Sequence, residues 1–214
     1  MARQPQQERA RRTADAILQA AFKAVAENGA QGATMRQIAD LAGVGVASLY
    51  EYFEDRDALL HAMSNRFSED ATRAIKEVTP TLVRLSIRDA VYELIVAFGE
   101  MMKRNDAVYL KCANQGLFLN QASELQAVYK ALIELFSQHT MYHPEHLQLK
   151  RVRTMTYIFL NSGVFTLVRY LSHPAPHFSF EELAAGMADM VGHYVDRELQ
   201  PGPRTGIASG RSPA

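Results

Sequence analysis

Apolar residues along most of this chain recur every three or four positions, which is the spacing of one face of an α-helix. We find no sequence stretch in which apolar and polar residues alternate between turn residues, as a half-buried strand requires. Proline is absent between Pro5 and Pro80, and long proline-free segments favour helices. The pattern therefore predicts an all-α fold of about nine helices.

The expected helices differ in length along the chain. The N-terminal ones are short, with a first helix over about 12–28, a second from the Thr34 cap to about Ala42, and a third that begins near Val46. From Arg56 onward they lengthen. We expect these longer helices over about 57–78, 86–104, 106–118, 121–142, 145–172 and 179–199.

Several helix ends carry capping signals. Asn28-Gly29 predicts the end of the first helix, and Gly43 can take the positive φ that ends the second. A capping box is expected where a Ser or Thr hydroxyl and a Glu or Gln three residues later satisfy each other's free backbone N–H groups. The two candidates are Thr34 with Gln37 and Ser179 with Glu182.

Two short helices joined by a tight glycine turn, after a supporting helix, are typical of a unit whose last helix enters a DNA major groove. Such a unit needs inward side chains that fix the angle between the helices. It also needs small outward ones that can approach bases, here Ala47 and Ser48. An ordinary helical hairpin has the same periodicity, so spacing alone leaves both readings open. The expected inward set is Ile38, Leu41, Val44, Leu49 and Phe53.

The residues themselves favour the DNA-binding interpretation. The segment from Thr34 to Leu60, TMRQIADLAGVGVASLYEYFEDRDALL, resembles the DNA-binding domain of the TetR family of transcriptional regulators, and the resemblance extends over about 12–66. Two positions depart from that family's pattern: Gly45 replaces Ser or Thr, and Arg56 replaces Lys. The matching residues are Thr34, Ile38, Ala39, Ala42, Gly43, Val44, Ala47, Ser48, Leu49, Tyr50, Tyr52, Phe53 and Leu59.

The resemblance implies roles for individual residues on DNA. Arg36 is expected at a guanine edge or a phosphate, and Tyr52 and Arg56 at the phosphate backbone. Ser48 and Tyr50 are expected at phosphates or thymine methyl groups. Glu51 either accepts from a cytosine amino group or is solvated at the helix end. The full expected set is Thr34, Arg36, Val46, Ala47, Ser48, Tyr50, Glu51, Tyr52, Arg56 and, from the N-terminal arm, Arg12.

The chain is expected to divide into four segments. Residues 1–11 form a flexible basic arm that either reaches an adjacent minor groove or is a solvated terminus. Residues 12–56 form the helix-turn-helix domain, 57–199 a larger helical domain, and 200–214 a disordered tail of low apolar content.

The larger domain is expected, from the resemblance, to bind an effector and to form a homodimer. Dimerisation also follows from geometry, because two recognition helices must engage half-sites one helical turn apart. Ligand binding would favour a conformation in which the helix that follows the recognition helix moves. The two recognition helices of the dimer would then no longer be in register with consecutive major grooves. The expected pocket residues are Met63, Phe67, Phe98, Met102, Cys112, Gln115, Tyr129, Tyr157, Asn161 and Phe165. The expected interface lies on the last two helices, at Ser162, Gly163, Thr166, Arg169, Tyr170, Gly186, Met190, His193 and Tyr194.

Composition limits the remaining classes. The chain of 214 residues has 23 basic and 23 acidic side chains, and the balance holds on both sides of Arg56. A DNA-binding domain that contacts few phosphates needs only local positive charge. We therefore expect its DNA binding to depend only modestly on salt concentration. No segment is apolar enough for a membrane span or signal peptide, and Cys112 is the only cysteine, so a cytoplasmic protein is expected.

Catalytic and metal chemistry find little support in the sequence. The glycines around Val44 follow a helix rather than a strand, unlike a phosphate-binding loop, and no nucleophile elbow is present in the sequence. His139, His143 and His146 have partly helical spacing but lack nearby Cys, so surface histidines are expected rather than a metal site. We expect no cofactor and no enzyme activity. The prediction is a dimeric repressor that binds a palindromic operator and is released by a small apolar or aromatic effector; a regulator or interaction module without an effector, or a helical enzyme, is the alternative.

Overall fold

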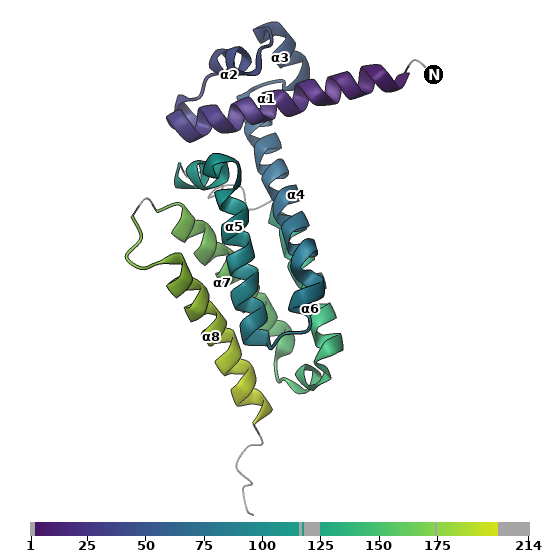
Figure 1. Cartoon of the computed structure of the whole chain (residues 1–214), viewed down its shortest axis with the longest axis vertical. Coiled ribbons are helices and arrows are strands. Elements are labelled where there is room, and N and C mark those ends of the chain that lie inside the picture. Colours follow the sequence, from purple (N-terminus) through teal and green to yellow (C-terminus); the bar gives the residue numbers. More distant parts are fainter. Residues whose placement is uncertain (1–2, 116, 118–124, 174, 201–214) are drawn as a thin grey trace, which may run out of the picture.

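The computed structural model describes residues 3–115, 117, 125–173 and 175–200. Within these ranges the chain forms eight α-helices and no strand, which confirms the all-α prediction. Three helices form one end of the elongated molecule, and the long helix α4 runs from them along the other helices (Figure 1). The elements are α1 (Arg3–Gly32), α2 (Met35–Ala42), α3 (Val46–Tyr52), α4 (Arg56–Leu82), α5 (Ile87–Asn114), α6 (Gln126–Tyr142), the 3-10 helix η2 (Pro144–Gln148), α7 (Val152–Leu171) and α8 (Phe180–Leu199).

Most of the predicted helix ends are confirmed. The backbone N–H of Gln37 donates to the Thr34 hydroxyl oxygen at 3.2 Å, which is one half of the capping box predicted there, and Gly43 ends α2 with φ 70°. Both halves of the predicted capping box at Ser179 and Glu182 are present at the start of α8. These caps satisfy backbone groups that helix ends leave free, so the short helices begin and end where local sequence directs them.

Several boundaries differ from the sequence predictions. Helix α1 begins at Arg3, so the segment expected as a flexible arm over 1–11 is helical from Arg3 onward; the helix breaks at Gly29, as predicted, but continues to Gly32. The helices expected over 86–104 and 106–118 are one element, α5, whose backbone leaves helical geometry from Arg104 to Ala107. Helix α6 begins at Gln126, and 118–124 lie outside the described residues. The tail over 201–214 also lies outside them.

The start of α7 also differs from the prediction. A helix was expected from about 145, but η2 occupies Pro144–Gln148 and Arg151 takes φ 56°, so α7 begins at Val152. A left-handed backbone at Arg151 cannot continue a right-handed helix. The consequence is a tight corner that turns the chain back between α6 and α7.

The core is continuous between the two ends of the molecule. Helix α5 packs against α1, α4 and α8, and α4 packs against α6. Where α1, α4 and α5 meet, Phe22, Phe67 and Tyr109 form edge-to-face ring pairs with centroids 5.1 and 5.3 Å apart. This aromatic cluster joins the N-terminal three-helix end to the larger helical part.

Candidate functional site: a nucleic-acid interface and an apolar cavity

Helix α3 contributes little to the core. Of its seven residues only Leu49 is buried, while Val46, Ala47, Tyr50 and Tyr52 are exposed. A short helix that is held by one buried anchor presents most of its side chains to solvent. This exposure is what a helix that reads a DNA groove requires.

The residues predicted to contact DNA gather around this helix. Thr34 and Arg36 are exposed at the N-terminus of α2, Glu51 is exposed on α3, and Ser48 is half-buried. Arg56 is half-buried at the start of α4, where the Asp55 carboxylate caps the helix by accepting from the Ala58 N–H at 2.7 Å. These residues share one end of the molecule.

Arg12 lies apart from these residues in sequence. It is exposed on α1 and forms an ion pair with Glu8 one turn away. Because this part of α1 is helical rather than flexible, a contact between Arg12 and DNA needs the helix itself to approach the duplex.

One side chain of the predicted inward set is placed differently. Leu41 is 51% exposed, so the prediction that it faces the core is wrong. The buried stripe of α2 consists of Met35, Ile38 and Ala39, and position 41 falls beside that stripe. Leu49 is buried, and Val44 and Phe53 pack partly buried against the core, as predicted.

Polar contacts connect the N-terminal end to α4 and α5. The Arg66 guanidinium on α4 donates to the Asp15 carboxylate on α1 at 3.0 Å. Asp70, one turn further along α4, accepts from the Tyr109 hydroxyl at 2.6 Å. Burial and this hydrogen bond raise the pKa of Tyr109, so the phenol stays protonated and keeps donating. These contacts tie α4 to both α1 and α5.

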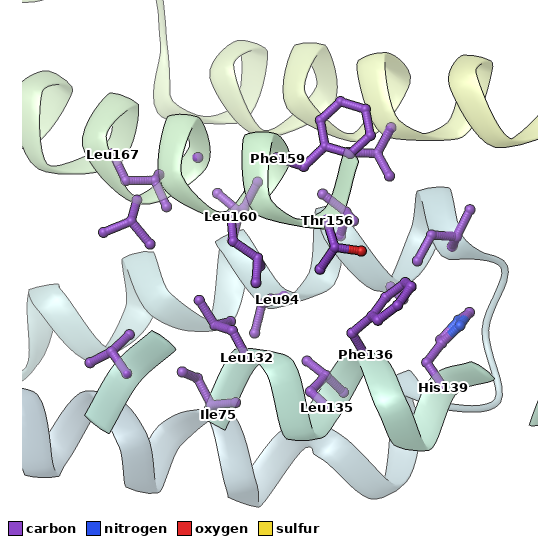
Figure 2. A pocket seen from close by; sticks show the side chains of 18 of the residues that line it. Ile75, Leu94, Leu132, Leu135, Phe136, His139, Thr156, Phe159, Leu160 and Leu167 are labelled. Carbon is purple, nitrogen blue, oxygen red and sulfur yellow. The ribbon is translucent and has the colours of Figure 1, made fainter. Parts of the chain in front are cut away.

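The larger helical part contains an apolar cavity of about 210 Å³. It lies between α4, α5, α6, α7 and α8, and its lining is almost entirely aliphatic and aromatic. Figure 2 shows Leu94, Leu132 and Leu160 directed into it. Cavities of this character are common sites for apolar small molecules.

Two of the ten predicted pocket residues line this cavity, Phe67 and Phe98. Met63, Met102 and Cys112 are buried in the core instead, and burial raises the pKa of the Cys112 thiol to about 12. Tyr157 and Phe165 lie on the exposed face of α7, Gln115 is exposed, and Tyr129 and Asn161 are half-buried away from the lining. The lining that the prediction missed is aliphatic, with Ile75, Leu94, Leu132, Leu135, Leu160 and Val164 among its members.

The sequence of α7 carried a signal for the missed lining, because this helix has apolar side chains on two opposite faces. Phe159, Leu160 and Val164 line the cavity, while Tyr157 and Phe165 are 70% and 63% exposed. The exposed face of α7 therefore carries large apolar side chains that the described residues leave uncovered.

The predicted interface residues fall into an exposed group and an engaged group. The engaged group is Gly163, which lines the cavity, Thr166, which is half-buried, Tyr170, whose hydroxyl donates to the Phe178 carbonyl, and Tyr194, whose hydroxyl donates to the Lys150 carbonyl. The exposed group is Ser162, Arg169, Gly186, Met190 and His193. The exposed members lie on α7 and α8.

The three histidines were expected on the surface, and this expectation is wrong for His139 and His146. His139 and His146 are buried, and the rings of His139, His143 and His146 stack with centroids 4.3 to 5.5 Å apart. Among the residues that the structure describes, no group of three His, Cys, Asp or Glu is placed to hold a metal ion. Burial lowers the pKa of His139 to about 4 and also lowers that of His146.

The N-terminal end of the chain matches a known family. Residues 17–63 match the family model described as "Bacterial regulatory proteins, tetR family". Residues 17–63 are therefore similar to a TetR-family DNA-binding domain. No curated protein matches the chain. In the described residues of this chain, no helix is long and apolar enough to cross a membrane.

Solved structures of TetR-family regulators share the fold at low identity. The fatty acid degradation regulator FadR from Bacillus halodurans has a TM-score of 0.65 at 17% identity, covering 89% of this chain and 96% of its own. FadR from Bacillus subtilis in complex with stearoyl-CoA gives 0.56 at 16%, covering 82% and 96%. The TetR-family repressor AlkX from Dietzia, implicated in biodegradation of n-alkanes, gives 0.57 at 18%, covering 86% and 96%.

Proposed function

We propose that this chain is a transcriptional repressor that binds a palindromic operator as a homodimer and releases it when an apolar effector fills the cavity. The observation that carries the proposal is the pairing of an exposed α3 with an apolar cavity whose wall includes α4. In this proposal α3 binds DNA, and α4 connects α3 to the ligand.

DNA recognition is assigned to α3 and its flanks. Tyr50 and Tyr52 are exposed aromatic side chains that the core does not need, and Ala47 is small enough to let the backbone approach base edges. Arg36 at the start of α2 and Arg56 at the start of α4 supply positive charge for phosphates on either side of α3.

Dimerisation is assigned to the exposed faces of α7 and α8. Tyr157, Ile158 and Phe165 form an apolar row on α7, and Met190 is exposed on α8. Contact between two such faces would bury the rows against each other across a two-fold axis. A dimer would also place two copies of α3 on half-sites one helical turn apart.

Release is assigned to α4. Phe67, Ala71 and Ile75 on this helix line the cavity, and the same helix begins at Arg56 beside the reader. A ligand that binds better to one position of α4 shifts the population toward that position. The Arg66–Asp15 ion pair then carries the shift to α1. Support for an apolar effector also comes from the fold's solved relatives, since one FadR structure holds stearoyl-CoA.

The experiment selects genomic fragments with the purified protein and then measures binding to the selected site. Tyr50→Ala should weaken binding at least tenfold by removing an exposed contact on α3. Tyr142→Ala is the matched control, because Tyr142 is a similarly exposed tyrosine on α6. Equal loss in both variants, or loss in neither, would contradict the assignment of α3.

A further inference from the structure

The apolar cavity has one polar region. Its polar lining side chains, within the described part of the chain, are His139, His146, Thr156 and Tyr194. The Tyr194 hydroxyl is already engaged, since it donates to the Lys150 carbonyl at 2.7 Å. His139 and His146 are only 2% and 4% exposed. In Figure 2 His139 lies at one end of the displayed lining and Leu167 at the other.

The hydrogen bond of His139 fixes which ring nitrogen carries the proton. Nε2 of His139 lies 3.0 Å from the backbone carbonyl oxygen of Leu85, and a carbonyl only accepts, so Nε2 is the donor. The low pKa of the buried ring keeps it neutral near pH 7. A neutral imidazole has one N–H, and Nδ1 is consequently an acceptor.

No described residue donates a hydrogen bond to this acceptor. Among the described residues, Nδ1 of His139, Nε2 of His143 and Nδ1 of His146 are buried without a hydrogen-bond partner, and of the three residues His139 and His146 line the cavity. Buried polar atoms are normally paired, so an unpaired acceptor on a residue that lines a cavity is a candidate partner for a ligand atom.

A metal ion does not explain the unpaired nitrogens. The rings of His139 and His146 are within 8° of parallel at 5.3 Å, and His139 and His143 are within 18° at 4.3 Å. Lone pairs of stacked, nearly parallel rings run in separate planes and do not converge on the single point that tetrahedral coordination needs.

We infer that the cavity binds an uncharged molecule with an apolar body and one hydroxyl or N–H group, which donates to Nδ1 of His139. The inference rests on the proposed function, because it names the effector class for the same cavity. A carboxylate does not suit the site: it can only accept, and no Lys or Arg is among the described lining residues. The volume of 210 Å³ exceeds the roughly 150 Å³ that admits benzene, which leaves room for a medium-length chain.

Three probes of similar size separate the possibilities. Octanol offers a donor, heptyl methyl ether is its isomer with an acceptor only, and octanoate is charged. Calorimetric titration of the full chain near pH 8 should show octanol binding at least tenfold more tightly than the ether, and octanoate more weakly still. Equal affinity for octanol and the ether, or tighter binding of octanoate, would overturn the inference but leave an apolar effector standing. Binding of none of the three would overturn the inference and the effector part of the proposed function together.

A substitution tests the nitrogen itself. In His139→Gln the amide N–H replaces Nε2–H toward the Leu85 carbonyl, while no acceptor remains at the Nδ1 position. This variant should bind octanol as weakly as the unchanged chain binds the ether, with its own ether affinity unaltered. Thr156→Val is the control at the same cavity and should keep the preference for octanol. If Thr156→Val removes the preference and His139→Gln does not, the assignment to His139 is wrong. If His139→Gln does not fold, nitrogen NMR of the unchanged chain decides: the Nδ1 resonance should shift with octanol and not with the ether, and no difference would overturn the inference.

Discussion

Truncation of Phe165 to alanine should separate the dimer. A buried aromatic side chain contributes about 150–250 Å² of surface. Phe165 is 63% exposed in the protomer, so roughly 100–150 Å² of it is available to a partner. At about 25 cal/mol per Å² this corresponds to about 3 kcal/mol per copy as an upper estimate, because association costs offset part of the buried area. A two-fold interface loses the contact twice.

Phe165→Ala should therefore raise the dimer Kd by a factor on the order of 10² to 10⁴. Sedimentation velocity over a protein concentration series measures this constant directly. Met141→Ala is the matched control, because Met141 is 81% exposed on α6, away from the proposed interface. An unchanged Kd in Phe165→Ala, or an equal change in both variants, would refute the assignment of the α7 face.

The remaining predictions concern stability and pH. Gly43→Ala should destabilise the protein by about 1 kcal/mol in urea unfolding, because φ 70° disfavours a Cβ although the space beside it is open; an unchanged or higher free energy of unfolding would contradict this. Tyr109→Phe should cost about 1.5 kcal/mol by removing the donor to the Asp70 carboxylate, and an unchanged urea midpoint would show that this bond is not formed in solution. Burial places the pKa of His139 near 4, below the unfolded value of 6.5, so the unfolded chain binds more protons between these values. Stability should be full above about pH 6.5 and fall by about 3 kcal/mol as the pH approaches 4, with buried His146 acting in the same direction; in His139→Gln the fall should be smaller, and an equal fall would refute this source.

The helix ends and the turn of the N-terminal helix-turn-helix could be predicted closely, because local sequence determines them. The Thr34 cap, the left-handed Gly43 and the anchor Leu49 each act over a few residues, and the structure contains all three. Leu41 was misplaced because a stripe read from spacing in an eight-residue helix is uncertain by one position, and the buried stripe includes Met35 instead.

The cavity could not be predicted in the same way. Its wall is built from five helices distant in sequence, and its aliphatic members carry the same periodicity as ordinary core residues. Aromatic and methionine residues such as Met63 and Met102 were expected at the ligand, but the structure places them in the solid core. The buried state of His139 and His146 was also missed, because it depends on the corner formed by η2 and Arg151.

Coupling between the cavity and the reader is the central claim, and one titration tests it most directly. Fluorescence anisotropy of a labelled operator, taken from the genomic selection, is measured with the protein at increasing octanol. The account predicts that the operator Kd rises at least tenfold as the cavity saturates, because the ligand shifts α4 away from the DNA-bound position. An operator Kd that stays constant while calorimetry shows the cavity filled would contradict it.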